Sequence, residues 1–194
     1  MHNLDTPFNP DLELSNSRVL LRPLCEHDFH LLMPFGWQEP ELWTYGLEAP
    51  TTEGSMRAYI QRALEQRSQG HSLPLVIIDQ ATGQVAGCTR YYHIQPAHLR
   101  VSIGYTWLGR AFQGTGINQA VKQLMLDYVF QTCRWERVEF MADVENKKSI
   151  SAILKLGAQA EGVLRSHAIK PDGARRDTAV FSLLRSDWLE IINS

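Results

Sequence analysis

The sequence predicts a mixed α/β fold (α+β in the wider sense), in which helices cover the faces of one central sheet. Segments with the alternating pattern of strands are joined first by short turns and later by helical segments, so both antiparallel hairpins and a β-α-β-α-β run are expected. The 194 residues, 44% of them hydrophobic, suit one domain spanning 1–194. No repeat, and no linker rich in proline, glycine or serine, divides the chain.

The first part of the chain is expected to alternate between strand, helix and loop. A loosely held arm is expected at 1–13, a strand at 18–22, a short helix at 26–33, an aromatic loop at 34–50 and a longer helix at 53–69. The longer helix is the best supported of these, because Met56, Tyr59, Ile60 and Ala63 recur at helical spacing and Gly70 follows it.

The middle of the chain predicts three strands and then the clearest helix. The strands are expected at 73–79, 85–94 and 99–108, the last of them with apolar residues at every second position. The helix is expected at 117–133, where apolar residues form one buried stripe: Ile117, Ala120, Val121, Leu124, Met125, Tyr128 and Val129.

The last part of the chain predicts a strand, a helix and a closing hairpin. The strand is expected at 137–144 and the helix at 146–156, with Asn146 as its N-cap and Gly157 as its C-cap. Strands at 163–170 and 178–184 would flank the turn at 171–173, and Ser186 would cap a last helical turn.

Composition limits the partners and the location. The formal net charge of −2 gives no field for collecting nucleic acid or an anionic membrane, and the basic pairs Lys147-Lys148 and Arg175-Arg176 are typical of a solvated surface. No signal peptide and no membrane-spanning run is recognisable. Three cysteines without CxxC spacing favour reduced thiols and a cytoplasmic protein.

The segment richest in chemical information is Leu108-Gly-Arg-Ala-Phe-Gln-Gly-Thr-Gly-Ile-Asn118, which leaves a strand and opens into the strongest helix. Backbone N–H groups and the helix dipole would converge there, and Gly114 and Gly116 would let a bulky anion approach the backbone. The Walker motif fails because no lysine follows, and the Rossmann motif fails because Gln119 stands at its third glycine position. A phosphate site and a plain strand-to-helix turn both fit this segment.

Residues 113–118 resemble the acyl-CoA motif Q/R-x-x-G-x-G/A of the GNAT N-acetyltransferases, with Asn118 departing at the sixth position. Residues 137–149 resemble the RimJ/RimL branch, which carries N-x-x-S where this chain has Asn146 and Ser149. Similar matches lie at 21–24, 156–158, 161–165, 172–177 and 186–188, so the resemblance spans nearly the whole chain.

The resemblance implies a mixed, mostly antiparallel twisted sheet whose middle strands splay apart, and direct transfer of an acetyl group from acetyl-CoA to a primary amine. It implies that the fourth-strand end at 105–108 supplies a backbone N–H to the thioester carbonyl. The residues it assigns to acetyl-CoA are Trp107, Leu108, Gln113, Gly114, Thr115, Gly116, Ile117, Asn118 and Asn146.

The resemblance also implies the catalytic residues. Asn146 would bind the pantetheine arm, and the Ser149 hydroxyl would lie near the sulfur of CoA. From spacing alone, simple helix capping is the better explanation of both residues, and the resemblance favours a dual role. Glu161 is the general base that similarity favours, with Glu139 and Asp143 as alternatives. Trp37, Trp43, Tyr45 and Tyr105 are the expected substrate-binding side chains, with a place in the core as the alternative for the first three.

Several alternatives stay open at this point. His93 and His98 have no third ligand nearby in the sequence, so no metal is expected. The acceptor would be a protein N-terminus or a small-molecule amine, and a homodimer is compatible with the sequence. A longer acyl chain on the donor, or a non-catalytic acyl-CoA-binding module that senses or scaffolds, would fit the same motifs.

Overall fold

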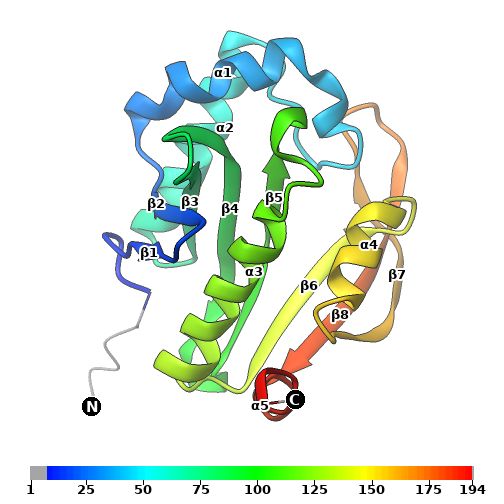
Figure 1. Ribbon diagram of the computed structural model, residues 1–194. Helices are drawn as coiled ribbons and strands as arrows, with labels where there is room; N and C mark the ends of the chain where they lie inside the picture. Colours follow the sequence, from blue (N-terminus) through cyan, green and yellow to red (C-terminus); the bar gives the residue numbers. More distant parts are fainter. Residues whose placement is uncertain (1–7, 194) are drawn as a thin grey trace.

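The computed structural model describes residues 8–193 and contains one eight-stranded sheet with the order β1-β2-β3-β4-β5-β6-β8-β7 (Figure 1). Its strands are β1 (Leu14–Ser15), β2 (Val19–Pro23), β3 (Ser72–Asp79), β4 (Gln84–Gln95), β5 (Arg100–Leu108), β6 (Arg137–Asp143), β7 (Gln159–Ile169) and β8 (Arg175–Leu184). β5 and β6 pair in parallel, and the other neighbours pair antiparallel. The expected mixed, mostly antiparallel sheet is confirmed.

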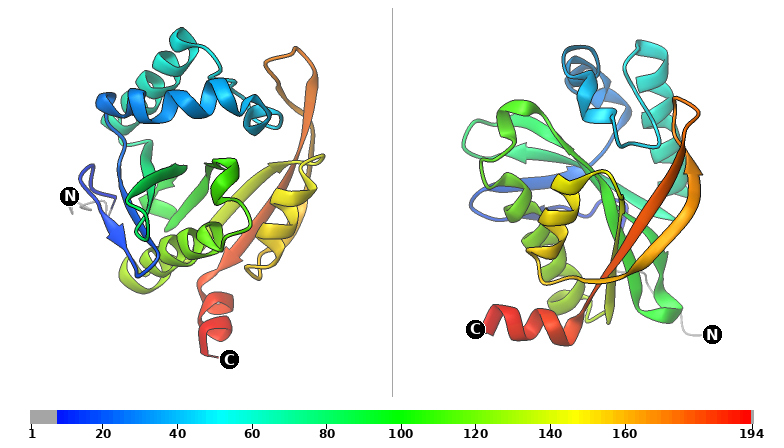
Figure 2. Two further views of the ribbon diagram at one scale, coloured as in Figure 1. Left: turned by 45° about the horizontal axis from the view of Figure 1, so that its top comes forward. Right: turned by 90° about the vertical axis from the view of Figure 1, so that its right-hand side faces the viewer.

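Helices cover both faces of this sheet (Figure 2). The α-helices are α1 (Phe29–Gln38), α2 (Glu53–Ser68), α3 (Ile117–Asp127), α4 (Lys147–Leu154) and α5 (Arg185–Asn193). The short 3-10 helices are η1 (Glu26–Asp28), η2 (Pro40–Trp43), η3 (Pro96–His98) and η4 (Arg110–Phe112), and η5 (Tyr128–Thr132) is a π-helix. The crossover from β5 to the parallel β6 runs through α3, as a parallel pair requires.

Two apolar clusters hold the helices to the sheet, one on each face. α3 contributes Ile117, Val121 and Met125, all fully buried, to the larger cluster. α1 and α2 form the smaller cluster on the opposite face, where Met56 and Trp43 pack near Trp107 of β5. The apolar stripe that predicted the helix at 117–133 is therefore the face that α3 buries.

The expected loop at 34–50 is wrong in its first part, because α1 continues through Pro34 to Gln38 and η2 follows. Proline removes one backbone donor from a helix, and packing outweighs that cost here. Met33 and Gly36 face the core, and a Cβ at Gly36 would stand 2.3 Å from the carbonyl oxygen of Pro50. At Gly36 the backbone of α1 therefore lies directly against Pro50, in the segment before α2.

The ends of the chain also differ from the sequence expectations. The α-helical part of the expected 117–133 helix stops at Asp127, and the final helix is longer than one turn. Residues 1–7 of the expected arm lie outside the described residues. The described part is anchored by Phe8, whose ring centroid lies 4.8 Å from that of Tyr91 and 4.9 Å from that of Trp135.

The three cysteines are free thiols. Within residues 8–193, no helix combines the length and the apolar character that a membrane crossing needs.

Candidate active site

The centre of the sheet opens between β5 and β6. These strands pair only where Arg100, Val101 and Ser102 face Arg137, Val138 and Glu139, and they diverge beyond that point (Figure 1). β4 continues beside β5 and β8 continues beside β6, so each strand stays anchored on its outer side. The splay that the resemblance implied therefore lies between residues 103–108 and 140–143.

A β-bulge lies on the β5 side of this opening. Tyr105 and Thr106 stand opposite the single residue Thr89 of β4, and Tyr105 has a φ of 50°. A bulge leaves a backbone group of the ladder unpaired, which is what a donor to a substrate carbonyl requires. The guanidinium of Arg90 lies 4.1 Å from the centre of the Tyr105 ring, and the ring of Tyr92 packs edge-on at 5.2 Å.

The glycine loop, residues 113–116, follows β5 and leads into α3. Gly114 and Gly116 have φ values of 75° and 86°, and no atom lies within 4 Å of the position that a Cβ would take at either residue. Gly116 is the N-cap, and it offers no side chain to the first N–H groups of α3. Free donors, open space and the positive end of the helix dipole together fit the pyrophosphate of a CoA molecule.

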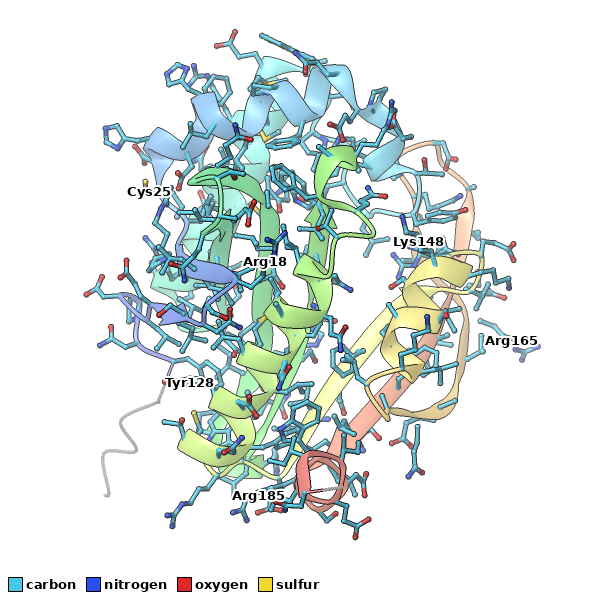
Figure 3. The ribbon with its side chains drawn as sticks, in the orientation of Figure 1. Arg18, Cys25, Tyr128, Lys148, Arg165 and Arg185 are labelled. Atoms are coloured by element: carbon cyan, nitrogen blue, oxygen red, sulfur yellow. The ribbon has the colours of Figure 1, made fainter. Side chains whose placement is uncertain are left out.

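Gln113 and Lys148 connect the two sides of the opening. The amide nitrogen of Gln113 donates to the carbonyl of Leu108 over 2.9 Å, and its amide oxygen accepts a 2.5 Å bond from Lys148 of α4. Figure 3 shows Lys148 extending from the start of α4 toward the loop before α3. Sequence reasoning treated Lys148 as a solvated surface residue. Its place two residues after the N-cap Asn146 is the signal that could have revealed it.

Asn146 caps α4 through its side chain. Its Oδ1 accepts a 3.0 Å bond from the backbone N–H of Ser149, so the capping expectation is confirmed. The bond uses the backbone of Ser149 and leaves its half-buried hydroxyl out of the cap. Both residues stand on the β6 side of the opening, just beyond the end of that strand.

Glu161 and Glu139 lie at the closed end of the β5–β6 pair. Glu161 accepts bonds of 2.5 Å from Ser182 and 2.8 Å from Arg137, and these bonds lower the pKa of its exposed carboxyl. Glu139 pairs with Arg100 and Arg137. In register, Glu139 faces Ser182 and lies four residues before Asp143, which is about 13 Å along a strand. The structure does not bring either glutamate to Asn146 and Ser149.

Asp143 is the candidate carboxylate that does lie beside Asn146. It ends β6, is 4% exposed, and its backbone carbonyl accepts the N–H of Asn146 over 2.9 Å. Its Oδ2 lies 4.0 Å from Nε of Arg176, which reaches it from β8. Asp143 is therefore positioned next to the opening, where its Oδ1 accepts a 2.9 Å bond from the backbone N–H of Glu145 and its Oδ2 faces Arg176.

The expected substrate-binding aromatics separate into different environments. Trp43 is buried, with its ring centroid 5.0 Å from that of Trp107, whose indole N–H donates to Tyr59. The carbonyl of Tyr45 accepts a 3.2 Å bond from Arg176. Trp37 is 62% exposed on α1.

A pocket of about 350 Å³ opens between the segment before α2 and the tip of the β7–β8 hairpin. Its walls are residues 47–50, Ser55 and Arg62 on one side and residues 169–171 on the other. Among residues 8–193, no three side chains of His, Cys, Asp or Glu gather as metal ligands would.

Comparison with known proteins identifies the family. The sequence profile of the acetyltransferase (GNAT) domain matches residues 18–159. The chain is 31% identical to "Uncharacterized N-acetyltransferase p20" of Bacillus licheniformis over 90% of its own length and 97% of that protein. It is also 28% identical to "Putative ribosomal N-acetyltransferase YdaF" of Bacillus subtilis, over 55% of its length and 57% of YdaF.

Among solved structures, a GCN5-related N-acetyltransferase from Brucella melitensis has 27% sequence identity and a TM-score of 0.86, covering 94% of this chain and 83% of that chain. These matches support an acyltransferase enzyme rather than a binding module without turnover. The sheet that opens between β5 and β6, with the glycine loop beside it, agrees with that assignment. The chain belongs to the GNAT family of acetyltransferases.

Proposed function

We propose that the protein transfers an acetyl group from acetyl-CoA to a primary amine by direct attack of the amine. The observation that carries the proposal is the convergence, at one end of β5, of an unpaired bulge and an open glycine loop. Acetyl-CoA would supply an activated acyl carbon and a thiolate leaving group. Gln113, Gly114, Thr115 and Gly116, with the first N–H groups of α3, would hold its pyrophosphate.

In this proposal the two sides of the opening have different tasks. The bulge at Tyr105 and Thr106 directs a backbone N–H to the thioester oxygen as negative charge develops there. From the β6 side, Asn146 contacts the pantetheine arm and the Ser149 hydroxyl donates a hydrogen bond to the departing sulfur, which leaves as the thiolate. The N–C bond forms as the C–S bond breaks.

The amine must lose a proton, because an alkylamine with a pKa near 10.4 and a protein N-terminus with a pKa near 8 are both mostly charged at pH 7. We assign the proton acceptor to Asp143, directly or through a water, because it lies beside Asn146 while Glu161 is held by Arg137 and Ser182. Glu161 stays the competing candidate.

The acceptor would approach through the pocket beside the β7–β8 hairpin. The hairpin and the segment before α2 both line it, and the bond from Arg176 to Tyr45 ties them together. A wide, open pocket suits the flexible N-terminus of a protein, and the name of YdaF points to ribosomal proteins as the first acceptors to test.

A thiol-release assay tests the proposal. Acetyl-CoA is offered with a panel of N-terminal peptides of ribosomal proteins, free amino acids and polyamines, and longer acyl-CoA donors are run beside it. We expect release of free CoA above the rate of hydrolysis with at least one amine, together with mass spectrometric detection of the acetylated amine. Turnover only with longer donors would correct the acyl group, and no turnover with any amine would overturn the proposal.

A further inference from the structure

Lys122 is a buried lysine that the proposed mechanism does not use. It lies on α3, is 7% exposed, and points its amine toward the sheet. Its Nζ lies 2.6 Å from the hydroxyl oxygen of Thr106 on β5. A side chain on a helix leans toward the helix N-terminus, so the amine reaches the strand below the first turns of α3.

Thr106 is one of the two residues that form the bulge. Its hydroxyl also lies 2.8 Å from that of Thr89, the β4 residue opposite the bulge. Lys122, Thr106 and Thr89 thus form a continuous polar chain from α3 across the irregular part of the β4–β5 pair. On the other face of the sheet, Arg90 covers the ring of Tyr105. The bulge is therefore clamped from both faces.

Among the described residues, no carboxylate compensates the charge of Lys122. Its amine contacts the hydroxyl of Thr106, which in turn contacts that of Thr89, and within residues 8–193 no acidic oxygen lies within 4.0 Å of the amine. Burial lowers the pKa of Lys122 to about 7. An apolar side chain of similar length would fill the same space without the cost of burying an amine.

We propose that Lys122 is a positioning residue that fixes the β5 bulge, through the Thr106 hydroxyl, in the conformation that receives the thioester carbonyl. The inference rests on the proposed acetyl-CoA reaction and names a residue for it outside the glycine loop. On this inference α3 has two roles: its N-terminus faces the glycine loop, and Lys122 in its second turn holds the bulge. Lys122 acts through Thr106 and does not itself touch the reacting atoms.

Binding of two ligands separates this task from a general effect on the site. Free CoA carries the pyrophosphate and the pantetheine arm but has no thioester carbonyl. For Lys122→Met we expect an affinity for CoA within about twofold of wild type, a weaker affinity for acetyl-CoA, and a kcat at least tenfold lower, about 1.4 kcal/mol in barrier. Titration calorimetry with each ligand and steady-state rates supply these values.

Thr106 offers a matched pair of control variants. Thr106→Val removes the hydroxyl and should reproduce the loss seen in Lys122→Met, whereas Thr106→Ser keeps the hydroxyl and should retain most of the rate. The Lys122→Met/Thr106→Val double variant should lose little more than either single variant, because both remove the same connection.

The outcomes distinguish this inference from the proposed function. If wild type binds neither CoA nor acetyl-CoA, the proposed function fails. If wild type binds both and Lys122→Met binds and turns over acetyl-CoA as wild type does, the positioning role alone is overturned. An equal loss of affinity for CoA and acetyl-CoA in a folded Lys122→Met would also overturn it, because that result would place the effect at the glycine loop. Should Lys122→Met not fold, the Thr106 pair decides the question alone.

Discussion

The two ends of the β5–β6 pair differ in their polar groups: one end is filled by ion pairs and the other is open. At the closed end, Arg100, Arg137, Glu139 and Glu161 form a continuous set of ion pairs. At the open end, the strands part, and the polar groups that face the opening include a strand bulge, the glycine loop and Lys148. The acidic groups at the closed end are paired with arginines, whereas at the open end no atom lies within 4 Å of the Cβ positions of Gly114 and Gly116.

This difference shows why an acidic residue near the middle of a sheet is a poor guide to a catalytic base. A carboxylate held by an arginine and a hydroxyl is stabilised in its charged form, which makes it a weaker proton acceptor. Glu161 is in that situation, and the lowered pKa follows from its bonds to Ser182 and Arg137. Asp143 ends β6 at the open end, whereas Glu139 of β6 and Glu161 of β7 lie at the closed end, and this difference in position separates the candidates more clearly than residue type does.

The largest expected effect concerns the carboxylates at the two ends. Asp143→Asn should lower kcat/KM by roughly 10²–10⁴, the range for loss of a general base, while Glu161→Gln should stay near wild type. Rates at several pH values, with two amines of different basicity, measure the effect and show whether the ascending limb follows the enzyme or the amine. If Glu161→Gln lowered kcat/KM more than Asp143→Asn did, Glu161 would be the general base, and the two ends of the β5–β6 pair would not differ as described.

The glycine loop offers the next largest effect. Gly116→Leu should weaken acetyl-CoA binding by about 10²-fold, about 2.7 kcal/mol, because its side chain would occupy the space facing the α3 donors. Gly83→Leu is the matched control, since Gly83 also has a positive φ, 70°, and open space, but lies in the β3–β4 turn. Titration calorimetry should show a loss of acetyl-CoA affinity in Gly116→Leu alone. Equal affinities in both folded variants would remove the glycine loop from the site.

Ser149 and Asn146 test whether capping and catalysis can be separated. Ser149→Ala should lower kcat about tenfold, about 1.4 kcal/mol, with the melting temperature unchanged, because the cap uses the backbone N–H of Ser149. Asn146→Ala should instead cost about 1 kcal/mol of unfolding free energy through loss of the cap. A lowered melting temperature with unchanged kcat in Ser149→Ala would favour a structural role for its hydroxyl.

Lys148 should have a smaller effect. Lys148→Met removes the bond to Gln113 that joins the two sides of the opening, and we expect the KM for acetyl-CoA to rise about threefold, well under 1 kcal/mol, as for an exposed polar contact. Lys147→Met is the neighbouring control, because the Lys147 amine bonds the carbonyl of Val144 within its own turn. Identical KM values for the two variants would show that Lys148 does not serve the site.

Lys122 provides a test of stability rather than of rate. Its pKa is about 7 in the folded protein and near 10.4 in the unfolded chain, so between these values the unfolded state binds more protons. The stability of wild type should therefore rise toward that of Lys122→Met as the pH increases from 7 to 10. Urea unfolding of both proteins across this pH range measures the free energies of unfolding to be compared. If the difference in unfolding free energy between wild type and Lys122→Met did not change with pH, Lys122 would not be a buried amine of lowered pKa.

Local sequence patterns determined much of this protein. The apolar stripe of α3, the Asn146 cap and the turn at 171–173 depend on neighbouring residues, so periodicity and turn chemistry predicted them. The glycine loop could be recognised for the same reason, since positive φ and a missing Cβ are properties of Gly114 and Gly116 themselves. The family followed from these motifs in their order along the chain.

The tertiary structure decided the features that depend on residues far apart. In the helix that runs through Pro34, Gly36 packs against Pro50, and the bulge at Tyr105 exists only relative to Thr89 on another strand. The ion pair of Glu161 with Arg137 spans 24 positions, and the contact of Lys148 with Gln113 spans 35. Charge and burial at such sites arise when distant segments meet, so the state of each candidate carboxylate and amine was fixed by packing and not by the residue alone.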